Sequence, residues 1–169
     1  LDARVAAAAA VCAPLDLSAV IHHIDHPRAT LYRRHVMRGL KDLYRNLHAE
    51  GRAPSPLEDV LAADTLREFD ARAIVPRFGF ADTDAYYDSQ RASNVLDQIE
   101  APTLYVATLH DPMIPARTSM PHLERASPAL DVRWIARGGH CYFPRHVDIG
   151  ADAPPRFYPQ LFAWLERWG

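Results

Sequence analysis

Apolar positions in the last third of the chain form two short runs, Thr103–Leu109 and Val132–Ala136, separated by a helix-length segment. Runs of this length, apolar on both faces, are typical of strands buried in a parallel sheet. A third apolar run, Val5–Ala13, opens the chain and ends at Pro14. We predict a buried strand here too, although its alanine content is also compatible with a helix. The pattern therefore predicts an α/β fold with parallel strands flanked by helices.

Residues 15–97 interrupt this rhythm with mostly helical patterns. One apolar set steps by three or four residues and predicts a helix from about Arg28 to His48; its members are Tyr32, Val36, Leu40, Leu43 and Leu47. We accordingly divide the chain into a core strand at 1–14, a helical insertion at 15–97 and the remaining core at 98–169. An insertion of this size between core strands is where α/β enzymes place a lid.

Two further helices are expected in the remaining core. The segment Ala116–Ala126 contains Pro121, which predicts a bent or late-starting helix. The last helix follows Asp152 and carries an apolar face at helical spacing, formed by Phe157, Leu161, Trp164, Leu165 and Trp168.

Both C-terminal strands lead into turns that could carry chemistry. Asp111 follows the first, between Leu109 and two prolines, and Gly138-Gly139-His140 follows the second. Because parallel strands place their carboxyl ends at one edge of the sheet, we expect Asp111 and His140 side by side there. These are two members of a Ser-His-Asp triad in the chain order of the α/β-hydrolases. Taken singly, each turn is also common in proteins without such a site.

Composition and charge limit the classes of molecule that this chain is expected to bind. The 169 residues are 49% hydrophobic and 24% charged, with a formal net charge of -2, which suits a globular domain. This charge argues against nucleic acid or an anionic membrane surface as a partner, since both require a clustered basic face. The longest apolar run is too short to span a bilayer. Two cysteines far apart in the sequence favour a reducing, cytoplasmic location.

The chain lacks a recognisable nucleophile. No Gly-x-Ser-x-Gly elbow occurs, and none of the six serines has glycines two positions to either side: Ser18, Ser55, Ser89, Ser93, Ser119 and Ser127. Cys12 follows a predicted strand, but its apolar surroundings favour an inert, protonated thiol. Cys141 adjoins His140, yet neighbouring side chains rarely point at each other, so neither cysteine is assigned a role.

One other cluster suggests a metal. His22 and His26 are four residues apart and can share a helix face, and Asp25 could add an oxygen ligand. A solvated, slightly basic turn is the alternative, and it is the interpretation that we favour because no third ligand follows at a comparable spacing. We therefore assign no metal and no cofactor.

Several segments together resemble the YheT-type α/β-hydrolases, a bacterial branch of a wider group of esterases. They are spread over essentially the whole chain: Val11–Leu17, Thr65–Asp70, Pro76, Gly79-Phe80, Tyr86-Tyr87, Ala92-Ser93, His110–Pro115 and Gly138–His140. The Thr65–Asp70 segment with the later tyrosine pair is the most specific, because many α/β-hydrolases share the Asp and His turns.

The resemblance implies Asp111 as the triad acid, His140 as the triad base and 15–97 as the lid. It also implies that the Ser elbow, the oxyanion-hole loop and the first strands precede the segment present here. We therefore expect the C-terminal part of a carboxylesterase acting on small or lipid-like esters, with its Ser outside this chain. The isolated chain should then be inactive, and its open strand edge should favour self-association. The alternative is a non-catalytic α/β-hydrolase-like binding module.

Overall fold

Three short strands form one parallel sheet in the order β1-β2-β3. They are β1 (Ala8–Val11), β2 (Thr103–Thr108) and β3 (Leu130–Ile135). Ala8 is in register with Thr103, and Thr103 with Leu130. The alanine run is thus a strand, shorter than the predicted 5–13, because its backbone pairs with β2 rather than within a helix. The α/β class with a parallel sheet is confirmed.

The computed structural model describes residues 4–169, which divide into two compact units. The core unit contains the described residues up to Asp16 together with Ala92–Gly169, and the helical unit contains Leu17–Arg91. The helical unit is therefore inserted between β1 and β2. No helix in the described residues is both long enough and apolar enough to cross a membrane.

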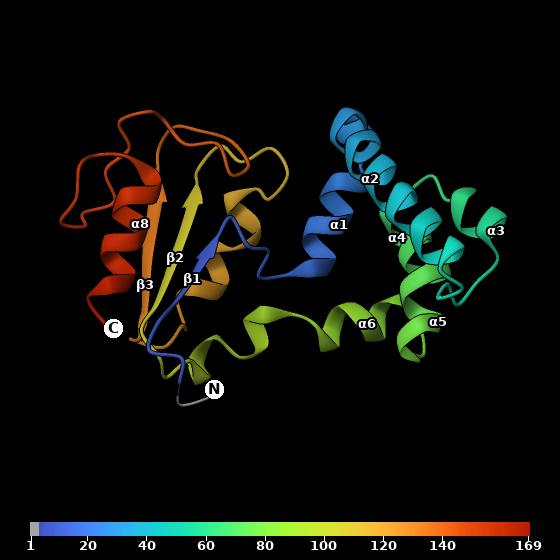
Figure 1. Ribbon diagram of the computed structural model, residues 1–169, viewed down its shortest axis with the longest axis horizontal. Coiled ribbons are helices and arrows are strands. Elements are labelled where there is room, and N and C mark those ends of the chain that lie inside the picture. Colours follow the sequence, from blue (N-terminus) through green and yellow to red (C-terminus); the bar gives the residue numbers. More distant parts are fainter. Residues whose placement is uncertain (1–3) are drawn as a thin grey trace. The chain divides into compact units, whose positions relative to one another are not determined.

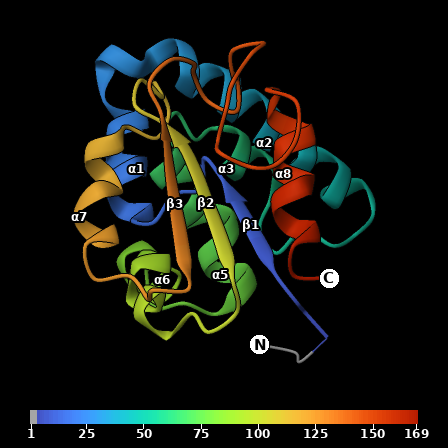
Figure 2. The same ribbon diagram turned by 90° about the vertical axis from the view of Figure 1, so that its left-hand side faces the viewer.

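Helices cover both faces of the sheet in the core unit (Figures 1 and 2). Leu104 and Val106 of β2 pack into a cluster with α8 (Phe157–Glu166), through Phe157 and Trp164. The alternate residues Tyr105 and Ala107 belong to a second cluster, on the side of α7 (Met120–Leu123). Burial on both faces explains why β2 reads as a continuous apolar run. Short 3₁₀ turns at Ala92–Asn94, Leu96–Gln98 and Ala116–Thr118 complete this unit.

The last helix buries a polar residue that its pattern did not reveal. Phe157 and Trp164 are buried as predicted, but Trp168 is half exposed. Gln160 is buried, and its side chain accepts from Ile149 N at 2.5 Å and donates to Ala153 O at 3.2 Å. Gln160 therefore fixes the loop that precedes α8.

The helical unit contains six α-helices, a 3₁₀ turn and a five-residue π-helix within its described residues. They are α1 (Leu17–Asp25), the 3₁₀ turn (Pro27–Ala29), α2 (Thr30–Ala49), α3 (Leu57–Leu61), α4 (Leu66–Phe69), the π-helix (Asp70–Ile74), α5 (Val75–Phe78) and α6 (Thr83–Ser89). The long α2 matches its predicted span. Its buried positions, however, are Met37 and Tyr44, whereas Tyr32 and Leu43 of the predicted face are exposed. The three-to-four spacing located the helix but placed its buried stripe one position away.

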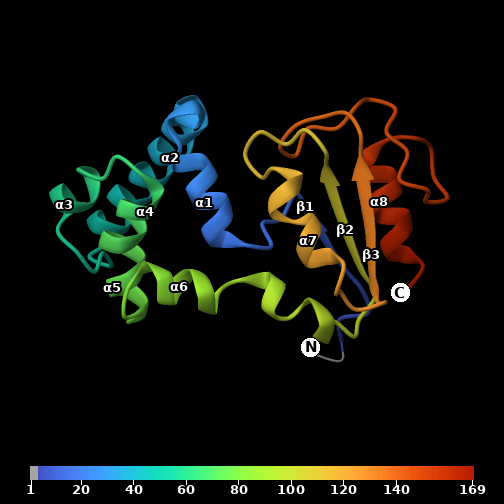
Figure 3. The ribbon, with the colours of Figure 1, turned by 180° about the vertical axis from the view of Figure 1, so that it is seen from behind.

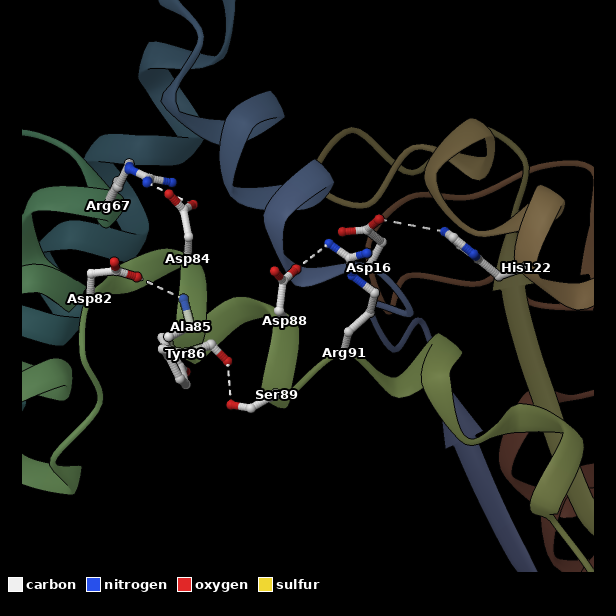
Figure 4. Close-up of polar contacts among 10 residues, drawn as sticks. All are labelled: Asp16, Arg67, Asp82, Asp84, Ala85, Tyr86, Asp88, Ser89, Arg91 and His122. Carbon is white, nitrogen blue, oxygen red and sulfur yellow. Dashed lines mark hydrogen bonds and ion pairs between the residues drawn. The ribbon is translucent and has the colours of Figure 1, made fainter.

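The Thr65–Asp70 segment acts as a local framework for this unit. Thr65 caps α4 by accepting from Glu68 N at 3.1 Å. The Asp25 carboxylate accepts from the backbone N–H groups of Leu66 and Arg67. Arg67 forms an ion pair with Asp84 at 2.8 Å, shown in Figure 4. The most specific segment of the resemblance therefore has a structural role.

Asp70 ends this segment at a partly buried position. Its carboxylate accepts a hydrogen bond from the hydroxyl of the buried Tyr87 at 2.8 Å. Burial raises the pKa of Asp70 to about 6, and the Tyr87 hydrogen bond opposes that rise only in part.

Candidate active site

Asp111 lies just beyond the carboxyl end of β2, where the sheet ladder continues through a 2.9 Å hydrogen bond from Leu109 N to Ile135 O. Its carboxylate is buried, and Oδ1 accepts from Met113 N at 2.8 Å and from Ile114 N at 2.9 Å. These two amides fix the orientation of the carboxylate and leave Oδ2 for another donor.

His140 lies beyond the carboxyl end of β3, after a turn that depends on glycine. Gly138 has φ 139°, and a Cβ at this position would overlap the Tyr142 carbonyl oxygen. Gly139 N donates to that carbonyl at 2.9 Å, and the Thr108 hydroxyl donates to the Gly139 carbonyl at 3.2 Å. Figure 3 shows the segments that leave β2 and β3 at the same end of the sheet.

The two turns bring the residues together. His140 Nδ1 lies 2.9 Å from Asp111 Oδ2; the Asp111 side chain is 1% exposed and the His140 side chain 31%. With the carboxylate ionised, Nδ1 carries the proton and donates it to Oδ2. Nε2 is then left with a free lone pair on a partly exposed ring. This arrangement can accept a proton at Nε2 and stabilise the resulting imidazolium.

A second Asp–His pair in the core unit provides a contrast. His122 Nε2 lies 3.6 Å from Asp16 Oδ2, as Figure 4 shows. That distance is too long for a hydrogen bond, and the Asp16 side chain is 15% exposed. Of these two pairs, the Asp111–His140 pair combines hydrogen-bond distance with a nearly inaccessible carboxylate.

Two thiols lie beside His140, and sequence reasoning missed this. Sγ of Cys12, Sγ of Cys141 and a ring nitrogen of His140 all lie within 4.8 Å of one another. Cys12 continues the β1 ladder through a 2.8 Å bond to Val106 O, and burial raises the pKa of its thiol to about 11. Although Cys141 and His140 are adjacent in sequence, Cys141 Sγ lies within 4.8 Å of a ring nitrogen of His140. The available signal was that Cys12, like His140, follows the end of a parallel strand.

The remaining candidates lie elsewhere. Ser18 and Ser89 belong to helices of the helical unit, and within residues 4–169 no serine hydroxyl hydrogen-bonds to His140. In the His22–His26 segment, where sequence reasoning weighed a metal site and favoured a solvated turn, His26 Nδ1 accepts from Arg28 N at 3.2 Å and the Asp25 carboxylate accepts from Leu66 N at 2.8 Å, so both side chains have local structural partners.

Relatives match most of the chain. It is 30% identical over 98% of its length to YheT of Escherichia coli, named as a candidate esterase. It is also 28% identical over 79% of its length to slr0264 of Synechocystis, named likewise, and 25% identical over 70% to an abhydrolase domain-containing protein of Dictyostelium discoideum.

The chain belongs to the YheT-type family of α/β-hydrolases. No protein-family model matches it. It spans 46% of the length of YheT and 37% of that of slr0264, so it corresponds to less than half of these relatives. Its three parallel strands with flanking helices are accordingly a partial α/β-hydrolase fold.

Proposed function

We propose that this chain supplies the acid–base pair of a serine carboxylesterase, and that the nucleophilic Ser lies outside residues 1–169. The observation that supports the proposal is the 2.9 Å bond between His140 Nδ1 and the buried Asp111 carboxylate. The names of the relatives, which describe them as esterases, support ester hydrolysis as the reaction class that we propose, and small or lipid-like esters are the substrates that we propose.

In this proposal each side chain has one task. His140 Nε2 accepts the proton of the nucleophile as it attacks the ester carbonyl, and then returns it to the departing alkoxide. A water molecule, activated by the same nitrogen, hydrolyses the acyl-enzyme. Asp111 keeps the proton on Nδ1 and stabilises the imidazolium, and the two amides on Oδ1 prevent the carboxylate from turning away. We further propose that the helical unit serves as the lid.

The first experiment locates the nucleophile. A fluorophosphonate probe is added to the purified 169-residue chain, which is examined by intact-mass analysis, and to native extract, which is probed with an antibody against α8. We expect the purified chain to stay unlabelled and a longer antibody-reactive species to be labelled. Labelling of the 169-residue chain itself would contradict the proposal, because the nucleophile would then lie within this chain.

The second experiment tests the two residues in the labelled longer species, using hydrolysis of a short-chain nitrophenyl ester. Asp111→Asn replaces the carboxylate that holds the proton on His140 Nδ1 by a neutral amide. We expect kcat to fall by about 10⁴-fold, the loss seen when the triad carboxylate of another serine hydrolase is replaced by an amide. Asp16→Asn is the matched control, because it alters the other Asp–His pair, and it should leave kcat unchanged. Equal losses in the two variants would refute the assignment of Asp111. An active ester hydrolase that retains its rate in His140→Ala would refute the assignment of His140.

A further inference from the structure

The three side chains Cys12, Cys141 and His140 form a compact group of soft ligands at the carboxyl edge of the sheet. Their donor atoms lie within 4.8 Å of one another, and both cysteines are free thiols. Cys12 has φ 48° and Cys141 has φ 52°, and among the described residues these are the two non-glycine positions with positive φ. Such conformations are unfavourable for a side-chain-bearing residue and are concentrated at functional sites.

Thiolates and imidazole are the ligands that Zn²⁺ prefers in proteins. Zinc–sulfur bonds of about 2.3 Å and zinc–nitrogen bonds of about 2.0 Å, in tetrahedral geometry, place the donor atoms about 3.4–3.8 Å apart. The observed limit of 4.8 Å, which holds for the two Sγ atoms and one ring nitrogen of His140, therefore requires these donors to approach by about 1.0–1.4 Å at most. Rotation of the exposed Cys141 side chain can provide part of this approach.

The surroundings of His140 match those of a zinc-binding histidine. Metal-bound histidines usually donate their other ring N–H to a carboxylate, which fixes the tautomer and the ring orientation. Here Asp111 Oδ2 lies 2.9 Å from Nδ1, which leaves Nε2 as the nitrogen with a free lone pair. We propose that Cys12, Cys141 and His140 Nε2 form a three-ligand site for Zn²⁺, with a fourth position open to water.

This site goes beyond the proposed esterase function and does not depend on it. It does use the same Nε2 lone pair, so a bound cation and proton transfer by His140 exclude each other. The cation also supplies positive charge beside two thiols, one of which is buried where an uncompensated thiolate would be unfavourable.

The experiment uses Co²⁺ as a spectroscopic substitute for Zn²⁺ on the 169-residue chain, kept reduced by a phosphine. We expect a thiolate-to-cobalt charge-transfer band with the intensity of two thiolates, together with the visible bands of a four-coordinate ion. One equivalent of Zn²⁺ should abolish both signals. Cys141→Ser should halve the charge-transfer band, and because Cys141 is exposed this variant should retain the fold.

Two more variants separate this site from adventitious binding. Asp111→Asn keeps an oxygen that can accept from Met113 N and Ile114 N but removes the carboxylate oxygen beside His140 Nδ1, and it should weaken Zn²⁺ binding by about 10–100-fold, measured by competition with a chromophoric chelator. His22→Ala, in an exposed position on α1, should leave the affinity unchanged. Absence of a charge-transfer band in the wild-type chain would overturn the proposal. So would a band that is unchanged in Cys141→Ser, or an affinity that falls in His22→Ala but not in Asp111→Asn.

Discussion

Replacing Gly138 by alanine tests whether the turn before His140 is as constrained as the structure indicates. The residue has φ 139°, and an added Cβ would overlap the Tyr142 carbonyl oxygen and lie 3.0 Å from Thr108 Cγ2. The neighbouring Gly139 is a matched control, since its Cβ would meet only Pro112 Cδ at 3.9 Å, an ordinary contact. The two variants add the same methyl group to adjacent residues.

The expected cost differs sharply between the two positions. A non-glycine residue in a disallowed backbone region costs about 1–3 kcal/mol, and relieving an overlap with a backbone carbonyl costs a further 1–3 kcal/mol, roughly. We therefore expect Gly138→Ala to lower the free energy of unfolding of the core unit by about 2–6 kcal/mol. Gly139→Ala should change it by less than about 0.5 kcal/mol.

Urea unfolding followed by tryptophan fluorescence measures this difference in the correct unit, because Trp134, Trp164 and Trp168 all lie within the core unit. For a urea m-value of about 2 kcal/mol per molar, Gly138→Ala should lower the midpoint by about 1–3 M. The low-field NMR signal of the His140 Nδ1 proton should also shift or disappear in this variant alone. Equal midpoints for the two variants would refute the proposed role of the Gly138 turn.

Two other predictions concern buried polar groups. The pKa of Asp70 is raised from 3.8 to about 6 in the folded chain, so its protonation stabilises the fold below about pH 4, and this stabilisation is lost as pH rises through 6. Asp70→Asn should therefore gain up to about 3 kcal/mol over the wild type between pH 4 and pH 7, measured by circular dichroism during urea unfolding. A difference that does not vary with pH would contradict this. Gln160→Leu leaves the Ile149 N–H without its acceptor and should lower the free energy of unfolding by about 1–3 kcal/mol, measured by urea unfolding followed by tryptophan fluorescence. Gln90→Leu, at an exposed position, is the control and should change this free energy little. Equal effects of the two substitutions would argue against the buried hydrogen bond.

The strands and the turns at Asp111 and His140 could be predicted from local sequence patterns, namely short apolar runs and the residues that follow them. Both turns follow short apolar runs that predict parallel strands, and parallel strands place their carboxyl ends at the same edge. The expected burial on two faces holds for β2 but not for β3, which is an edge strand of the described sheet and exposes Arg133. The juxtaposition of the two residues thus follows from strand direction and needs no knowledge of side-chain packing. The same local information also placed the long helix α2, since a spacing of three and four residues specifies a helix.

Tertiary structure decided what those elements place against one another. The buried face of α2 runs through Met37 and Tyr44, which depends on the neighbouring helices and cannot be read from the spacing alone. Gln160 is buried because the loop before α8 brings Ile149 N–H to it, across a distance in sequence that no local pattern encodes. Cys12 and Cys141 are separated by most of the chain, and they meet at His140 because β1 and β3 end at the same edge of the sheet. Sequence determines such a cluster only through the fold, since strand pairing sets the distances between residues that are remote in the chain.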